Sequence, residues 1–105
     1  MAQAANKSSF GSLQNDAYKR FIRLLVHRRD ASGLKQQQVA DKLGWNQSVI
    51  AKIECVERRV DFVEFVLIAN AVGYDAAALV PEVRAILEEE GYLSPGCNTG
   101  KMDQG

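Results

Sequence analysis

The chain contains few of the residues from which reactive or cross-linked sites are built. Its 105 residues include two cysteines, Cys55 and Cys97, and a single histidine, His27. Two cysteines without histidines at ligand spacing do not make a zinc site, and a disulfide would be unusual in a reducing cytosol. Neither a nucleophile–base pair nor a glycine-rich phosphate loop is visible. The sequence therefore predicts two free thiols, an ordinary histidine, no metal, no cofactor and no enzyme activity.

Long apolar runs are also missing. No segment approaches the roughly 20 apolar residues that span a bilayer, and residues 1–14 have no apolar core of a secretory signal. We therefore expect a cytoplasmic protein that does not enter a membrane. A length of 105 residues fits one small domain with a modest core, which oligomerisation would help to stabilise.

An excess of charge of one sign is the third absence, since 13 basic residues balance 13 acidic ones. The two signs are unevenly distributed. Residues 17–80 hold ten Lys or Arg and seven Asp or Glu, whereas residues 81–105 hold two and five. A mildly basic body with an acidic C-terminal segment is compatible with nucleic acid as a partner, but it predicts modest non-specific affinity.

Apolar residues recur at helical spacing along most of the chain, and neither strand-like alternation nor an internal repeat is visible. We therefore predict an all-α fold: a bundle of about five helices with a sixth helix at its C-terminal end. The expected helices cover residues 16–31, 34–43, 46–54, 62–72, 76–80 and 81–90. The predicted organisation is a disordered N-terminal arm (1–12), a domain (13–80), a C-terminal helix (81–93) and a disordered tail (94–105).

The most informative stretch is residues 34–54, LKQQQVADKLGWNQSVIAKIE. Gly44 ends a first short helix, because glycine readily takes the left-handed conformation after a helix C-terminus. Asn46 is a natural N-cap for a second one. In that second helix Ile50 and Ile53 share one face, while small polar and basic side chains lie elsewhere. Two helices joined by such a tight turn can place a polar helix face in the major groove of DNA.

With these helices placed, residues 18–80 resemble the helix-turn-helix family of phage lambda Cro and repressor proteins and the xenobiotic-response-element-type regulators of bacteria. That family shows a first-helix arginine, a Gly-Leu step, a Gln that opens helix two, an Ala, a Leu-Gly turn, a Gln/Ser-rich start to helix three and an Ile-Glu at its end. Here these features are Arg29, Gly33-Leu34, Gln36, Ala40, Leu43-Gly44, Gln47-Ser48 and Ile53-Glu54. The resemblance implies a lambda-repressor-like bundle in a bacterial or phage-encoded protein that binds double-stranded DNA.

The resemblance also implies roles for individual residues. The expected base-reading residues lie on helix three: Gln47, Ser48 and Lys52, with Asn46 and Ala51 beside them. The expected phosphate contacts are Gln36, at the start of helix two, and the connector residues Arg58 and Arg59. Arg59 has an alternative, which is to pair with Asp61 or Glu64. Arg29 and Glu54 are expected to form a partly buried ion pair that orients helix three and reads no base.

Three departures from the family pattern fall next to this motif. Lys35 stands where a Thr or Ser N-cap is frequent, so helix two is expected to start less firmly. Cys55-Val56 replaces a variable residue plus glycine, which is expected to alter how the connector leaves helix three. Trp45 is larger than the usual valine and either packs on the core or touches the DNA backbone.

We therefore expect a transcriptional regulator, a repressor in particular, that occupies an operator as a homodimer. Residues 74–91 are the expected dimer seam, because Ala76 to Val80 and then Val83, Ile86 and Leu87 form an apolar stripe; the alternative is that this stripe covers the chain's own core. Two other functions stay open. One is an antitoxin that binds a protein partner through residues 81–105 and regulates its own gene. The other is a protein-interaction module that has lost DNA binding.

Overall fold

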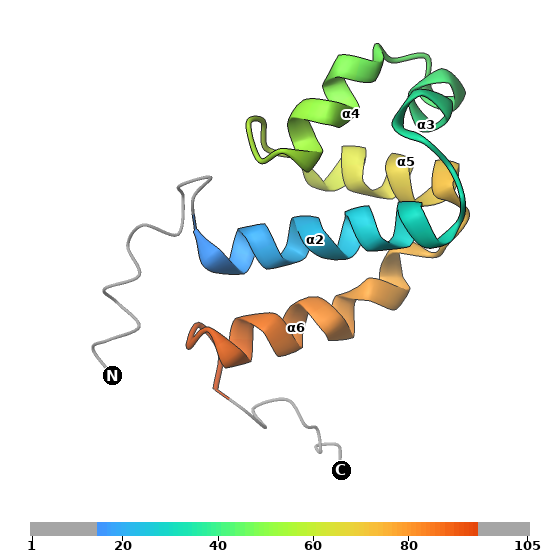
Figure 1. The fold of residues 1–105 in the computed structure, drawn as a ribbon. Helices are drawn as coiled ribbons and strands as arrows, with labels where there is room; N and C mark the ends of the chain where they lie inside the picture. The colour runs from blue at the N-terminus through green and yellow to red at the C-terminus, as the bar shows by residue number, and fades with distance from the viewer. Residues whose placement is uncertain (1–14, 95–105) are drawn as a thin grey trace.

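A computed structural model describes residues 15–94, and over these residues the regular structure is helical throughout. The helices are α2 (Asp16–Ala31), α3 (Gln36–Leu43), α4 (Gln47–Glu54), α5 (Phe62–Val72), the short 3-10 helix η2 (Ala76–Leu79) and α6 (Val80–Glu89) (Figure 1). The predicted all-α class is confirmed. The fifth predicted helix is a 3-10 turn that runs directly into the sixth. The predicted arm, Cys97 and residues 95–105 of the predicted tail lie outside the described residues.

The helix ends follow local chemistry at α2 and α5. Asn15 precedes α2 and its side chain accepts the Tyr18 N–H at 3.0 Å. At the start of α5, Asp61 and Glu64 each accept the other's backbone N–H, which forms a capping box. Gly73 then ends α5 with a φ of 111°.

The two helices of the motif begin without a side-chain cap. Asn46 occupies the N-cap position of α4, but its side chain makes no capping hydrogen bond, contrary to the expectation. The Lys35 side chain ends in an ammonium group, which donates hydrogen bonds but accepts none, so it cannot cap α3. The Lys35 N–H instead donates to the side-chain oxygen of Gln38 at 2.8 Å, which supplies one half of a capping box.

The core lies where α2 meets α3, α4 and α5, with η2 closing one end. Its fully buried large side chains come from four different helices: Ile22, Val39, Ile53 and Leu79. Burial of each such side chain contributes about 1.5–3 kcal/mol to folding. Trp45 is half-buried and packs against this core, which is one of the two roles that the sequence left open for its indole.

The expected dimer seam along residues 74–91 is wrong for its central residues. Leu79 is fully buried and Ile86 is 6% exposed, because α6 runs back along α2 and turns this stripe onto the chain's own core (Figure 1). Ion pairs flank the contact. Arg20 of α2 pairs with Glu89 at 2.6 Å and Glu90 at 3.2 Å, and Arg28 pairs with Glu82 at 3.0 Å.

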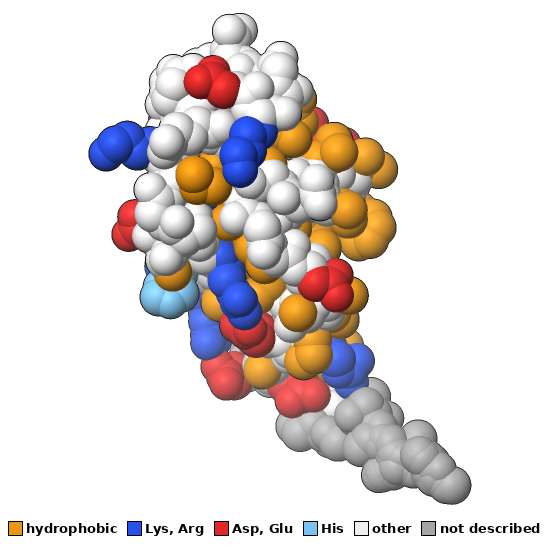
Figure 2. Space-filling model, turned by 90° about the vertical axis from the view of Figure 1, so that its right-hand side faces the viewer, with side chains coloured by type: hydrophobic (Ala, Val, Ile, Leu, Met, Phe, Trp, Pro, Cys, Tyr) orange, Lys and Arg blue, Asp and Glu red, His pale blue; other side chains and the backbone are white. Residues whose placement is uncertain are grey.

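The space-filling view shows this arrangement on the surface. In the lower half of Figure 2, where α2 and α6 lie, basic and acidic side chains stand next to one another. Two of the three glutamates in the run 88–90, Glu89 and Glu90, are therefore used in intramolecular pairs.

The connector leaves α4 through an unusual backbone conformation. Val56 has a φ of 63°, and it is the non-glycine residue with positive φ in the described part of the chain. The family pattern places glycine here, which adopts this conformation without steric cost. Val56 is half-buried and packs against the core. Its side-chain contacts therefore offset the cost of a conformation that β-branched residues rarely adopt.

Candidate nucleic-acid interface

Helices α3 and α4 form a helix-turn-helix whose turn is closed by the backbone. Gly44 takes a φ of 72°, and the Trp45 N–H donates to the Ala40 carbonyl at 2.9 Å. The apolar sides of both helices face the core through Val39, Ala40, Ile50 and Ile53, all nearly or fully buried. The opposite side of α4 therefore points away from the protein.

That outer side carries the residues that were expected to read bases. Asn46, Ser48 and Lys52 are exposed, whereas Gln47 and Ala51 are half-buried. The exposed groups comprise an amide, a hydroxyl and an ammonium, which suit hydrogen bonding to base edges, and Ala51 offers a methyl group. The structure places four of these residues on α4 and the fifth, Asn46, at its N-cap, all within two turns.

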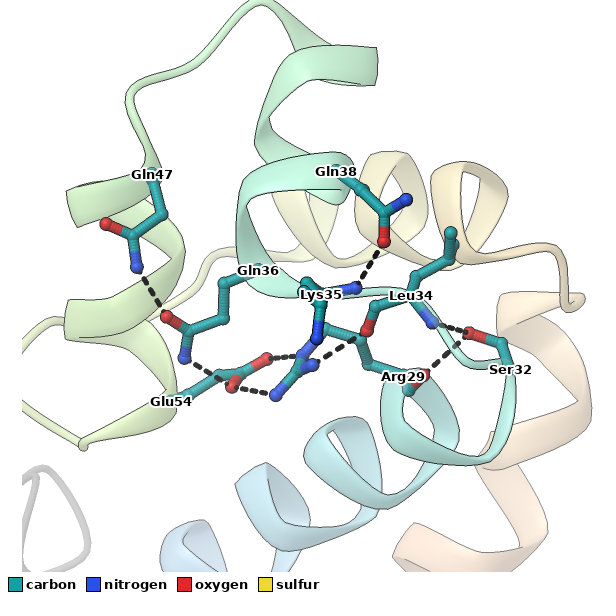
Figure 3. A network of polar contacts seen from close by, with 8 residues as sticks. All are labelled: Arg29, Ser32, Leu34, Lys35, Gln36, Gln38, Gln47 and Glu54. Atoms are coloured by element: carbon teal, nitrogen blue, oxygen red, sulfur yellow. Dashed lines mark hydrogen bonds and ion pairs between the residues drawn. The ribbon is translucent and has the colours of Figure 1, made fainter.

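A continuous chain of polar contacts supports the first turn of α4 from behind (Figure 3). Arg29 donates to both carboxylate oxygens of Glu54, at 2.6 and 2.8 Å, and to the Leu34 carbonyl at 2.8 Å. Gln36 donates from its side-chain nitrogen to Glu54 at 2.8 Å. Gln47 in turn donates to the side-chain oxygen of Gln36 at 2.6 Å. The chain thus links α2, α3 and both ends of α4.

Arg29 and Glu54 form the ion pair that the resemblance implied, and it is well shielded from water. Their side chains are 14% and 11% exposed. The hydrogen bonds to Glu54 raise the pKa of the Arg29 guanidinium, so this arginine stays charged. A bidentate guanidinium–carboxylate contact fixes orientation as well as distance, and this one holds α4 against α2.

Gln36 makes two side-chain contacts within the protein, which the sequence did not predict. Its amide nitrogen donates to Glu54 and its oxygen accepts from Gln47. These contacts join the start of α3 to both ends of α4 at no regular spacing, so periodicity offers no signal for them. A glutamine that was expected to hold a phosphate is thus placed to position the first residue of α4.

An open hollow of about 470 Å³ lies beside this chain of contacts. Its lining includes Gly33, Leu34, Lys35, Gln36 and Gln47. Unpaired backbone N–H groups at the start of a helix point outward with the positive end of the helix dipole. Together with the exposed ammonium of Lys35, the start of α3 therefore suits a phosphate group.

The contacts also restrict Gln47 without using up its hydrogen-bonding capacity. One N–H of its amide is bound to Gln36, and its oxygen points away from Gln36 (Figure 3). One N–H and the oxygen therefore stay available, which is the pair that an amide uses to bind the N7 and N6 edge of adenine. A side chain held in this way loses less conformational entropy when it binds a base.

The two connector arginines have different surroundings. Arg58 donates to both oxygens of Glu64, at 3.1 and 2.9 Å, so it is Arg58 and not Arg59 that pairs with Glu64. These hydrogen bonds raise the pKa of Arg58 and lower the pKa of Glu64. The Arg59 guanidinium lies over the Tyr18 ring at 4.4 Å, and residue 59 is exposed. Of the two, Arg59 is the more exposed, whereas Arg58 is half-buried and is held by Glu64.

We also searched residues 15–94 for a metal site and for a membrane-spanning helix. No cluster of three or more His, Cys, Asp or Glu in this part of the chain is arranged to hold a metal ion. No single helix there is long and apolar enough to cross a bilayer. Only α5 together with η2 and α6 reaches the required length and composition, as a pair bent by 107°.

Two comparisons with known proteins, one with family models and one with solved structures, find similarity to this chain. A family model described as a helix-turn-helix domain matches residues 20–82. A solved structure, an XRE-family like protein from Pseudomonas syringae pv. tomato str. DC3000, is 33% identical in sequence, with a TM-score of 0.68. The match covers 74% of this chain and 95% of that one. No curated protein matches the chain. The family match spans α3, α4, α5, η2 and most of α2.

Proposed function

The chain belongs to the helix-turn-helix family of Cro and XRE-type regulators, and on that premise we propose that it represses transcription by binding an operator sequence through α4. The observation that carries this proposal is the polar chain from Arg29 to Gln47. It holds the first turn of α4 in place and leaves one N–H and the oxygen of the Gln47 amide available. A supported, outward amide at the start of such a helix suits direct reading of bases.

In the proposed complex each exposed group has a specific partner. Gln47 binds adenine through its amide, Lys52 binds the O6 and N7 edge of guanine, and Ser48 donates to or accepts from a base beside them. Asn46 lies at the edge of this set, and the Ala51 methyl group contacts a thymine methyl. Sequence specificity thus comes from about two turns of one helix.

The contacts with the DNA backbone lie at two places. The start of α3, with Gln36 and Lys35, binds one phosphate through helix N–H groups and the ammonium. Arg59 binds another from the connector that leaves α4. Because net charge is zero, we propose that few phosphates are neutralised, so that non-specific binding stays weak.

Two copies are proposed to occupy one operator in the bacterial or phage-infected cytoplasm. One helix-turn-helix reads only a few base pairs, whereas two related by a twofold axis read half-sites about 34–36 Å apart. Occupation of the promoter by such a pair would block transcription. The antitoxin alternative needs a partner surface in residues 81–105, and there Glu82, Glu89 and Glu90 are already paired with arginines of α2.

The test is selection from a randomised DNA duplex with the full chain, followed by gel shifts on the selected sequence and on DNA upstream of the gene. We expect enrichment of a palindromic sequence with half-sites about one helical turn apart. Ala85→Ser, at an exposed position of α6, serves as a variant that should select the same sequence. Recovery of unenriched random sequence would overturn the proposal and favour the interaction module.

A further inference from the structure

The surface of α5 departs from the rest of the molecule in its apolar content. The large hydrophobic side chains that are exposed in residues 15–94 all lie on α5 or at the first residue of α6. They are Phe62, Val63, Val66, Leu67 and Val80, with exposed fractions of 73%, 65%, 39%, 42% and 49%. Figure 2 shows hydrophobic side chains gathered along one edge of the molecule. We call these five residues, with Ala76 and Ala77, the α5 face.

We propose that a second copy of this chain binds the α5 face across a twofold axis, and that this face, rather than α6, is the dimer seam. The proposal deepens the proposed function, since it identifies the surface that brings two reading helices together. Because two copies can associate without DNA, this proposal can be tested independently of the proposed DNA binding.

The shape of the α5 face suits contact with itself. A hollow of about 280 Å³ opens between α5 and η2, with Phe65, Val66, Ala76 and Val80 in its lining. Phe62 lies at the edge of this hollow and has the most exposed large hydrophobic side chain. A protruding ring next to a hollow of alanines and valines lets each copy insert its ring into the other. Such reciprocal contacts are what a twofold interface requires.

The low charge and the apolar content of the α5 face agree with a second copy of the chain as its partner. Asp75 is the charged residue in the lining of the hollow, and depletion of charge is typical of interface cores. A specific interface buries at least about 1,000 Å² in total, and the five large side chains of the α5 face, which are 39–73% exposed, supply an apolar centre for one. An apolar surface of this kind left in water also favours non-specific association, which a defined partner prevents.

The position of the face relative to α4 agrees with two reading helices on one DNA duplex. Residues 55–61 connect α4 directly to α5, and the start of α5 lies beside the end of α4 that is nearest α2 (Figure 1). A twofold axis at this seam therefore keeps both copies of α4 close to it. The face of α6 lies on the other side of α2 from α4 (Figure 1), which places it far from such an arrangement.

The experiment is sedimentation equilibrium of the full chain between 1 and about 100 µM, a range in which interfaces of this size associate. We expect concentration-dependent dimers of the parent chain. Phe62→Asp/Val66→Asp should raise the dimer dissociation constant at least 100-fold, because the charges would be buried at the seam. Both side chains are exposed in the single chain, so the circular dichroism spectrum and the melting temperature of the variant should stay close to those of the parent.

Ala85→Asp, at an exposed position of α6, is the matched control and should dimerise like the parent. A folded parent that stays monomeric at 100 µM would overturn the proposal and leave the face to a different protein. Dimers of the double variant, or loss of dimers in Ala85→Asp, would also overturn it. A parent that dimerises through α5 but selects no DNA sequence would instead overturn only the proposed function.

Discussion

Helix α2 holds α4 and α6 by the same chemistry, an arginine paired with a carboxylate, but in different surroundings. The side chains of Arg29 and Glu54 are 14% and 11% exposed, whereas those of Arg28 and Glu82 are 38% and 46% exposed. Water and salt compete for the second pair and hardly for the first. The comparison teaches that the ion pair behind α4 determines an orientation, while those along α6 add little to an apolar contact made by Leu79 and Ile86.

The largest effect is expected where the shielded pair is broken. Glu54→Ala leaves the Arg29 charge without its partner and removes the acceptor of Gln36, so the free energy of unfolding should fall by about 3 kcal/mol. Urea unfolding measures this. Glu57→Ala, an exposed glutamate three residues further on, should change stability by less than about 0.5 kcal/mol. A Glu54→Ala protein as stable as the parent would show that this pair does not hold α4.

A smaller effect is expected one step along the same chain of contacts. Gln36→Ala frees the Gln47 amide and costs about 1 kcal/mol on the operator, the value of one intramolecular hydrogen bond. The ratio of operator affinity to random-DNA affinity should therefore fall about fivefold. Gln37→Ala, whose side chain contacts Asp41, should leave this ratio unchanged. If Gln36→Ala weakens binding to both DNAs equally, Gln36 holds a phosphate but does not position Gln47.

Breaking the exposed ion pair between Arg28 and Glu82 should change stability only weakly. Glu82→Gln removes the partner of Arg28, and stability should fall by less than about 1 kcal/mol at low salt. In about 1 M NaCl the difference from the parent should vanish, because exposed charges are screened over a few ångströms. Glu88→Gln, a position without an ion pair in residues 15–94, is the control. A loss as large as that of Glu54→Ala would remove the distinction between the two pairs.

The smallest expected effect is on how stability depends on pH, and it comes from the pair that Arg58 of the connector forms with Glu64. Hydrogen bonds from Arg58 lower the pKa of Glu64 below its ordinary value of 4.5. This contribution to stability is fully present above that value and is lost as pH falls through the lowered pKa. The parent should therefore lose more stability than Glu64→Gln between about pH 5 and about pH 3. Identical pH dependence of the two proteins would mean that this pair is absent in solution.

Local helix signals were sufficient to predict most of the fold. The helical spacing of apolar residues located the helices, and Gly44 ends α3 as the sequence predicts. Sequence patterns do not reveal which surface covers an amphipathic stripe. The pattern of residues 76–87 predicts an apolar side but not whether the chain itself or a second copy covers it, and here α2 covers its centre.

The α5 face could have been found in the sequence. FVEFVLIANAV is apolar on nearly every side, which is more than one buried face requires. In the interface, the family pattern located the residues on α4 but not their contacts. The links from Gln47 to Gln36 and from Arg58 to Glu64 connect separate elements at no helical spacing, so only the three-dimensional structure reveals them.

The central claim is that α4 reads bases while the connector holds the backbone, and one set of binding curves tests it most directly. Affinity is measured for the selected operator and for random DNA, over a range of salt concentrations, with Gln47→Ala, Lys52→Ala and Arg59→Ala. The α4 variants should lose about 1–3 kcal/mol on the operator only. Arg59→Ala should weaken binding to both DNAs and reduce the salt slope by about one unit. Equal losses on both DNAs for the α4 variants would contradict the account.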